Sequence, residues 1–160
     1  MGAGPFKGAY ALVSLIGLVL MIWAYSGMRA GPAAADILYT PADWTRHAAM
    51  LLVLLAFIAL GASHGKGYLK LWLKQPMSIG IVLWSGAHLL ANGGRGDVYF
   101  FGTFFVIAIV DIVLSTMRGK VPSHEPRIRS DILAVVIGVL LYALFLFGFH
   151  PYVLNLPVAG

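Results

Sequence analysis

Residues 131–150 read DILAVVIGVLLYALFLFGFH, a run with no charged residue after its first position. A helix needs roughly 17–25 largely apolar residues to cross a bilayer, and this run is long enough. Four other stretches approach the same length and composition, at residues 8–27, 44–63, 76–92 and 97–117. The sequence therefore predicts an all-α fold, a polytopic membrane helical bundle of about five transmembrane helices.

The composition supports a chain that exposes its apolar surface to lipid. Of the 160 residues, 60% are hydrophobic and 11% are charged, whereas soluble domains have about 45–50% apolar and about 25% charged residues. We expect residues 1–160 to form a single transmembrane domain with membrane lipid as its partner. The basic residues flank apolar runs instead of lining a soluble face, so we expect no nucleic-acid partner. The pattern does not define an oligomeric state.

The basic residues divide unevenly between the two predicted membrane sides. Five spans place most of the 11 basic residues on one side: Lys7, Lys66, Lys70, Lys74, Arg118, Lys120, Arg127 and Arg129. The other side receives Arg29, Arg46 and Arg95. The positive-inside rule then predicts a cytoplasmic N-terminus and a periplasmic C-terminus in a bacterial inner membrane. A cleaved secretion signal is the alternative interpretation of residues 8–27, because Lys7, the apolar run and Ala33-Ala34-Ala35 roughly fit one.

Three of the five histidines fall at one predicted end of the bundle. His88 lies inside the 76–92 stretch, where an ionisable group is costly and is by default a functional candidate. His47 enters its span from the same side, and His150 ends the last span there. We take His88 and His47 as the candidate ligand pair, with His150 as the runner-up. We expect His64 and His124, on the opposite side, to be interfacial residues.

The residues around these histidines favour haem b over zinc. Zinc takes three or four ligands from Cys, His, Asp and Glu, but the chain has no cysteine and Asp111 lies toward the other side. Haem b needs one or two axial ligands in an apolar slot. Trp84, one turn before His88, is a candidate wall of that slot. Arg46 and Arg95 are candidate partners for the haem propionates.

Asp111 is the only acidic residue well inside a predicted span. A carboxyl group at that depth should be protonated or paired, and Arg118 on the same helical face is the expected partner. A structural role and a role in proton transfer both remain open at this point.

The sequence Ala87-His88-Leu89-Leu90-Ala91-Asn92-Gly93 resembles a characteristic block of the membrane protein family NnrU. Leu73-Lys74-Gln75-Pro76-Met77, Arg46-His47 and the terminal His150-Pro151-Tyr152 look similar to that family too, so the resemblance covers about residues 8–155. The family often has Arg-His-Pro-Met where this chain has Lys74-Gln75-Pro76-Met77. The resemblance implies a role in denitrification, where NnrU proteins are needed for nitrite and nitric oxide reductase activity or expression.

The family is related to the 15-cis-zeta-carotene isomerase of plants and cyanobacteria, an integral membrane haem b enzyme. This relationship implies that His88 matches one axial histidine of the isomerase, and His47 is the best match for the other. The isomerase has a cysteine three residues before the first of these histidines. Here that position is Ser85, so a thiolate-linked ligand switch cannot operate.

Three functions follow from these residues and the resemblance. The first is a bis-histidine haem b protein of denitrification, nitrogen-oxide metabolism or redox sensing, in which His47 dissociates at a helix end and nitric oxide binds. The second is a haem-dependent cis–trans isomerase of a polyene such as zeta-carotene. The third is a haem-free membrane assembly factor, in which His88 and Asp111 only hydrogen-bond between helices.

Overall fold

The computed structural model describes residues 3–153, and within that range the chain is helical with short connections. Its elements are the α-helices α1 (Ala3–Ala30), α2 (Thr45–His64), α3 (Tyr68–Leu73), α4 (Pro76–Ala91), α5 (Arg95–Met117) and α6 (Ile128–Leu144), the 3-10 helix η1 (Pro32–Ala35) and the π-helix η2 (Phe145–Val153). The all-α prediction is confirmed.

Four of the helical segments are long and apolar enough to cross a membrane. They are Gly4–Ala30, Thr45–His64, Arg95–Met117 and Ile128–Tyr152, and the apolar α4 is a shorter fifth. At a rise of 1.5 Å per residue, the 16 residues of α4 extend about 24 Å, less than the roughly 30 Å hydrocarbon core. Their length and composition identify an integral membrane protein with a polytopic helical bundle.

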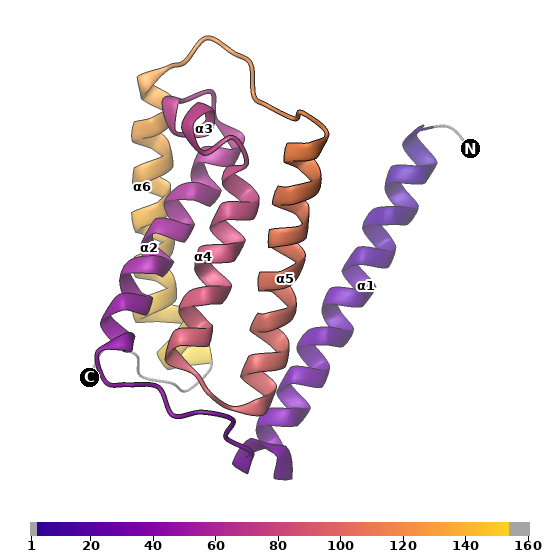
Figure 1. Ribbon diagram of the computed structural model, residues 1–160, viewed down its shortest axis with the longest axis vertical. Coiled ribbons are helices and arrows are strands. Elements are labelled where there is room, and N and C mark those ends of the chain that lie inside the picture. The colour runs from indigo at the N-terminus through magenta and orange to yellow at the C-terminus, as the bar shows by residue number, and fades with distance from the viewer. Residues whose placement is uncertain (1–2, 154–160) are drawn as a thin grey trace.

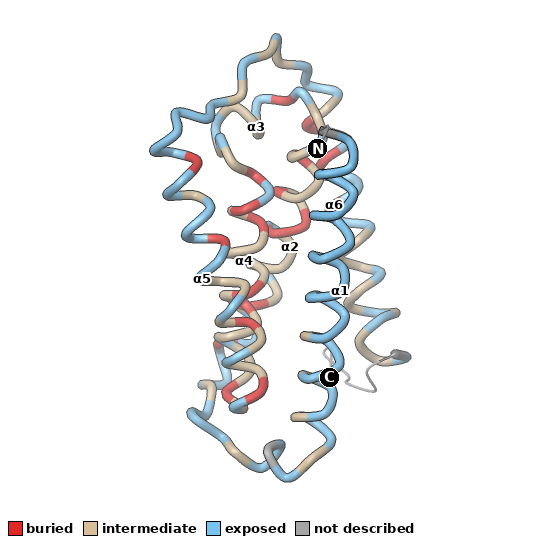
Figure 2. The backbone as a smooth tube through the Cα atoms, turned by 90° about the vertical axis from the view of Figure 1, so that its right-hand side faces the viewer, coloured by how far each residue is buried: buried red, intermediate tan, exposed pale blue. Residues whose placement is uncertain are grey.

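The bundle consists of α2, α4, α5 and α6, with α1 at its edge. Helix α2 packs against both α4 and α6, and α4 packs against α5. Within residues 3–153, helix α1 contacts α5 and η1, and Figure 1 shows it meeting α5 at the lower end and leaning away above. Almost the whole of α1 is therefore exposed, as Figure 2 shows.

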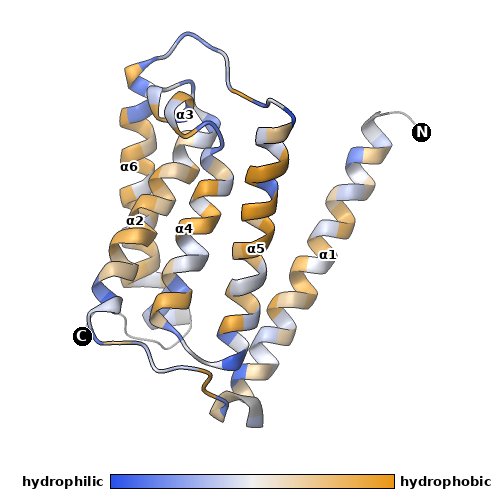
Figure 3. Ribbon diagram, viewed as in Figure 1, coloured by the Kyte–Doolittle hydropathy of each residue, from blue (hydrophilic) through white to orange (hydrophobic). Residues whose placement is uncertain are grey.

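Small residues form the contacts between helices, and large apolar side chains face outward. The apolar helix surfaces are visible in Figure 3, with polar residues gathered at the ends and in the links. The buried apolar residues are Ala49, Ala56, Phe57, Ala59, Ala62, Ala87, Phe101, Ala108 and Ala134. A Cβ atom on Gly138 of α6 would lie 2.8 Å from the backbone of Ile58 in α2. Close approach of this kind is the usual way in which helices associate in lipid.

The sequence also explains where the central helices begin and end. Pro76 occupies the first turn of α4, where its missing N–H has no intrahelical partner. Asp97 lies in the first turn of α5 and complements the helix dipole. Gly119, with φ of 63°, follows the end of α5, and the N–H of Lys120 donates to the carbonyl of Ser115 at 3.0 Å. This is a glycine-terminated Schellman ending.

The link between α1 and α2 is joined to the link between α4 and α5. The N–H of Leu38 donates to the carbonyl of Gly93 at 2.8 Å, and the N–H of Arg95 donates to the carbonyl of Asp36 at 2.8 Å. A Cβ on Gly93 would lie 1.7 Å from the carbonyl oxygen of Tyr39, so this contact requires glycine. These bonds fix the lower end of the bundle in Figure 1, where α4 ends.

Candidate functional site

His88 lies near the end of α4, where aromatic side chains pack around its ring. The ring of Phe101, from α5, is stacked on it with centroids 4.3 Å apart. The indole of Trp84 lies 5.0 Å away, and His88 Nδ1 is 2.9 Å from the Trp84 carbonyl oxygen. Because a carbonyl oxygen only accepts hydrogen bonds, Nδ1 carries the hydrogen, and Nε2 of the neutral ring keeps its lone pair.

His150 lies in η2, a helix of the wide π type. Its side-chain Nδ1 is 2.8 Å from the carbonyl oxygen of Phe145, five residues earlier in the chain. Pro151 follows inside the same helix, and proline disrupts regular α-helical bonding because it lacks an N–H and its ring needs room. The same argument as for His88 leaves the lone pair on Nε2 of His150. Short π-helical segments often occur at functional sites.

The two imidazoles lie next to each other. Their ring centroids are 6.3 Å apart, and their planes differ by 27°. In the described residues 3–153, the hydrogen bonds of both rings involve Nδ1, and neither Nε2 has a partner. A histidine that binds a metal usually donates its other N–H to a carbonyl in this way, which fixes the tautomer and the ring orientation. In their neutral form, both rings therefore keep on Nε2 the lone pair that a metal ligand needs.

Apolar rings extend the site on both sides of the pair. Trp84 makes edge contacts with Phe101 and Phe104, at centroid distances of 5.2 and 5.5 Å. Phe149 lies 6.2 Å from His150 on the η2 side. Trp84 lies against His88 in an aromatic, apolar lining, and its role as the wall of a haem slot stays a prediction.

His47 is the predicted ligand that the structure leaves apart from His88. It is the third residue of α2 and its side chain is exposed. In the described residues, the ring neighbours of His88 are Trp84, Phe101 and His150. The structure thus pairs His88 with the runner-up, and a ligand role for His47 stays a prediction. The useful signal was Pro151 after His150, because proline predicts a departure from regular helix.

The two arginines predicted to bind propionates lie at this same end. Arg95 is the first residue of α5, and its guanidinium is 3.4 Å from the carboxylate of Asp36. Its side chain is about half exposed, 46% of it, so this guanidinium is available to acidic groups in the interfacial region. Arg46 is exposed at the start of α2, next to His47.

Asp111 lies outside this site, and its partner differs from the expected one. The hydroxyl of Ser78 on α4 donates to Asp111 Oδ2 at 2.5 Å, whereas the expected pairing with Arg118 is not found among the described residues. Ser78 is ten residues before His88, which is about 15 Å along the helix. Asp111 therefore joins α4 to α5 far from the histidines.

Few side chains that could bind a metal ion lie near the histidine pair. Among residues 3–153, no group of three or more His, Cys, Asp and Glu residues is arranged to hold a metal ion. The site offers two imidazoles inside an apolar aromatic lining, and this suits a metal that brings most of its own ligands. His64 and His124 bond to Ser63 and to the carbonyl of Gly67 at the other end of the bundle.

The family model described as NnrU protein matches residues 1–158 of the chain. The chain belongs to the NnrU family. This match confirms the resemblance found in the Ala-His-Leu-Leu-Ala-Asn-Gly block that contains His88. No curated protein and no solved structure matches the chain.

Proposed function

We propose that this NnrU protein binds haem b at the end of the bundle that carries His88 and His150, with these two residues as axial ligands. In this proposal the protein acts in nitrogen-oxide metabolism or redox sensing. One observation carries it: both Nδ1 atoms donate to backbone carbonyls and both Nε2 atoms are without a partner. A purely structural pair of histidines would not need both rings held in the metal-binding tautomer.

The residues at the site fit haem b better than a bare metal ion. Haem iron takes one or two axial imidazoles, and the macrocycle supplies the remaining ligands. A structural zinc ion would need four protein ligands, and the described residues offer two at this site. Trp84, Phe104 and Phe149 supply the apolar surroundings that the macrocycle requires. Arg95 lies at the same end and already binds one carboxylate, that of Asp36.

Bound there, haem b would supply one-electron redox chemistry and a position for a small gas such as nitric oxide. The chain constrains the imidazole of His88 more tightly than that of His150. His88 sits within α4, stacked on Phe101 and bonded to the Trp84 carbonyl. His150 sits in a π-helix interrupted by Pro151 near the end of the chain. We therefore assign the fixed ligand to His88 and the exchangeable ligand to His150, with His47 as the alternative.

The surroundings of His88 favour gas or electron chemistry over polyene isomerisation. Ser85 occupies the position of the isomerase cysteine, it is fully buried, and its hydroxyl donates to the Ile81 carbonyl at 2.6 Å. No thiolate is present there to exchange with a histidine. Nitric oxide is small and apolar, so it reaches an aromatic site directly from the lipid.

The orientation of the protein in the membrane is part of the proposal. The upper end in Figure 1 carries α3 and the α5–α6 link, and with them most of the basic residues. The positive-inside rule places that end in the cytoplasm and the histidines on the periplasmic side of a bacterial inner membrane. Reporter fusions after Lys120 and after Gly94 test this: the first should report the cytoplasm and the second the periplasm.

The first experiment is absorption spectroscopy of the full chain in mild detergent, oxidised and reduced. The wild type should show a Soret band and a sharp α-band on reduction, typical of two imidazole ligands. His88→Ala should lose the haem. His150→Ala should keep it but become high-spin, and His47→Ala is the matched control with an unchanged spectrum.

Other outcomes of this experiment would change the proposal. A high-spin His47→Ala protein beside an unchanged His150→Ala protein would restore His47 as the second ligand. A wild type that stays colourless after haem addition would refute haem binding, and it would favour the assembly-factor function.

A further inference from the structure

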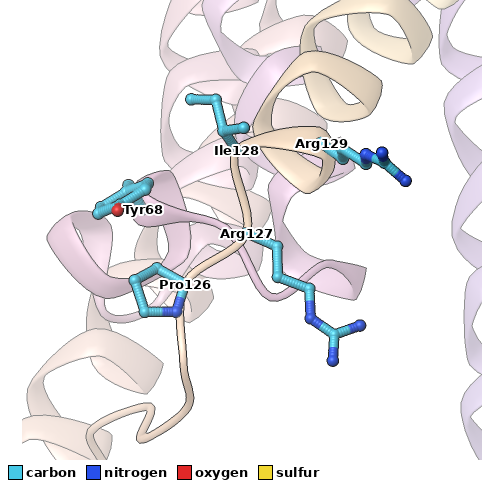
Figure 4. A pocket seen from close by; sticks show the side chains of 5 residues that line it. All are labelled: Tyr68, Pro126, Arg127, Ile128 and Arg129. Atoms are coloured by element: carbon cyan, nitrogen blue, oxygen red, sulfur yellow. The ribbon is translucent and has the colours of Figure 1, made fainter.

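A pocket of about 560 Å³ lies at the end of the bundle opposite the histidines. It is lined by Tyr68, at the start of α3, and by residues 126–129, which lead into α6. Figure 4 shows the five side chains around it. We call this part of the molecule the basic end, because Lys66, Arg127 and Arg129 all lie there.

The backbone on the two sides of the pocket is fixed. The N–H of Arg127 donates to the carbonyl of Lys66 at 2.8 Å. The carboxylate of Asp131 accepts the N–H groups of Tyr68 and Leu69 at 2.8 and 3.0 Å. A Cβ on Gly67 would lie 2.0 Å from that carboxylate, so this contact requires glycine. These bonds hold the two segments that line this open surface pocket.

The two arginines of the pocket carry charges that the protein does not neutralise. Among residues 3–153, the one ion pair found joins Arg95 to Asp36 at the other end. Asp131 is committed to two backbone N–H groups. Glu125, two residues before Arg127, is exposed and pairs with neither arginine. Arg127 and Arg129 are exposed and have no ion-pair partner among the described residues, and guanidinium groups bind phosphate well because they offer paired donors.

The rest of the pocket is apolar and aromatic. Tyr68 is 42% and Ile128 62% exposed. In Figure 4 both arginine side chains extend to the right of the segment, and Tyr68 and Ile128 lie to its left. Trp72, on the next turn of α3, is 74% exposed, with its ring 6.3 Å from that of Tyr68. Exposed tyrosine and tryptophan are typical of the headgroup layer of a membrane.

We infer that this pocket binds the headgroup of an anionic phospholipid. Arg127 and Arg129 hold the phosphate, and the apolar side with Tyr68 and Ile128 receives the glycerol and the start of an acyl chain. A free phosphate ion would use the charged side alone and leave the apolar side in water. The other basic residues of this end attract anionic lipids only through their general charge. These two differ because they share a pocket with an apolar half.

The test measures lipid binding to the full chain in detergent by native mass spectrometry. Phosphatidylglycerol should bind with a saturable dissociation constant, and phosphatidylcholine should bind at least about tenfold more weakly. Removal of one pocket charge should weaken phosphatidylglycerol binding about fivefold, so Arg127→Gln with Arg129→Gln should weaken it about 25-fold. The matched control is Arg118→Gln with Lys120→Gln, which removes the same charge from the same end outside the pocket, and should stay within twofold.

Three results would overturn the inference. Equal weakening in the control pair would show general surface attraction, and equal binding of phosphatidylcholine would show that charge is irrelevant. Displacement of phosphatidylglycerol by an equal concentration of inorganic phosphate would identify a free-anion site. Each variant must match the wild type in its elution volume on size-exclusion chromatography and in its helical content by circular dichroism. If the double variant does not fold, the single variants Arg127→Gln and Arg129→Gln decide the question, and each should bind phosphatidylglycerol about fivefold more weakly.

Discussion

The two ends of the bundle differ in what holds them. At the histidine end, which carries His88, His150 and the joined links 36–39 and 93–95, several interactions share the work: backbone bonds, ring contacts, and the carboxylates of Asp36 and Asp97. At the basic end, a backbone bond and one buried carboxylate, that of Asp131, join the start of α6 to the segment around α3. The comparison teaches that the hydrogen bonds of His88 and His150 use Nδ1 alone among the described residues, so their Nε2 atoms hold no part of the fold together there. The key carboxylate of the basic end is structural.

The largest effect that the proposed function predicts is on nitric oxide binding by the reduced protein loaded with haem b. A position that opens in about 1% of molecules slows association about a hundredfold, so His150→Ala should bind nitric oxide about a hundredfold faster than the wild type. Stopped-flow absorption measures the rate. This would show that His150 is free to leave without disturbing the bundle.

The control for this prediction is His47→Ala, because His47 is an exposed histidine at the same end. Its association rate should equal that of the wild type. A hundredfold increase in His47→Ala instead would assign the exchangeable position to His47. An unchanged rate in both variants would remove the distinction between a fixed and an exchangeable imidazole.

At the basic end, loss of the Asp131 carboxylate should lower the free energy of unfolding. Asp131→Ala leaves the N–H groups of Tyr68 and Leu69 without their acceptor, at a cost of about 3 kcal/mol in the free energy of unfolding. Asp131→Asn keeps one acceptor oxygen and should lose about half as much. Unfolding followed by circular dichroism in detergent measures both. Asp43→Ala, at an exposed aspartate, should change little, and an equal loss there would contradict the argument.

The helices at both ends could be predicted from sequence because length and apolar composition are local properties. The predicted spans 44–63 and 97–117 correspond to α2 and α5 within a few residues. His88 was identified for the same reason, as an ionisable residue inside one such span. An ionisable residue within an apolar stretch can be recognised from the sequence without knowledge of the tertiary structure.

The pairings could not be predicted, because they depend on helix rotation and on the register of the last helix. His150 lies next to His88 in a segment, residues 145–153, that forms a π-helix and not the expected α-helix. Asp111 binds Ser78 because α5 turns that face toward α4. The role of Asp131 as the acceptor for α3 depends on Gly67, which leaves room for its carboxylate. Each is a contact between residues at least 33 positions apart in the sequence.

A smaller effect is expected where α1 joins the histidine end. The hydroxyl of Tyr25 donates to Asp97 Oδ1 at 2.6 Å, and the Tyr25 ring stacks on Phe100 at 4.5 Å. Tyr25→Phe removes the hydrogen bond, worth about 1 kcal/mol, and should increase detachment of α1 about fivefold. Since the chain has no cysteine, spin labels on Val13→Cys and Val106→Cys report the distance between α1 and α5.

The control for Tyr25→Phe is Tyr10→Phe, because Tyr10 is 69% exposed on the same helix. The label distances should broaden in Tyr25→Phe and stay unchanged in Tyr10→Phe. Equal broadening in both would mean that α1 is held by something other than the Tyr25–Asp97 bond.

The smallest expected effect is a pH dependence at Tyr39, in the α1–α2 link of the histidine end. Its hydroxyl donates to the carbonyls of Leu89 and Asn92, and burial, together with the negative charge of Asp97, raises the pKa of Tyr39 above its usual value. In the unfolded chain a tyrosine ionises near about pH 10. Because the folded-state pKa is higher, the neutral phenol stabilises the fold fully below that pH, and the contribution disappears as the pH rises through the folded-state pKa.

The unfolding midpoint of the wild type should therefore fall more steeply from about pH 9 to about pH 11 than that of Tyr39→Phe. The difference between the two slopes isolates Tyr39 from the other tyrosines of the chain. If Tyr39→Phe keeps the wild-type slope, the phenol does not join the link to the end of α4, and the backbone bonds of Gly93 hold the histidine end without it.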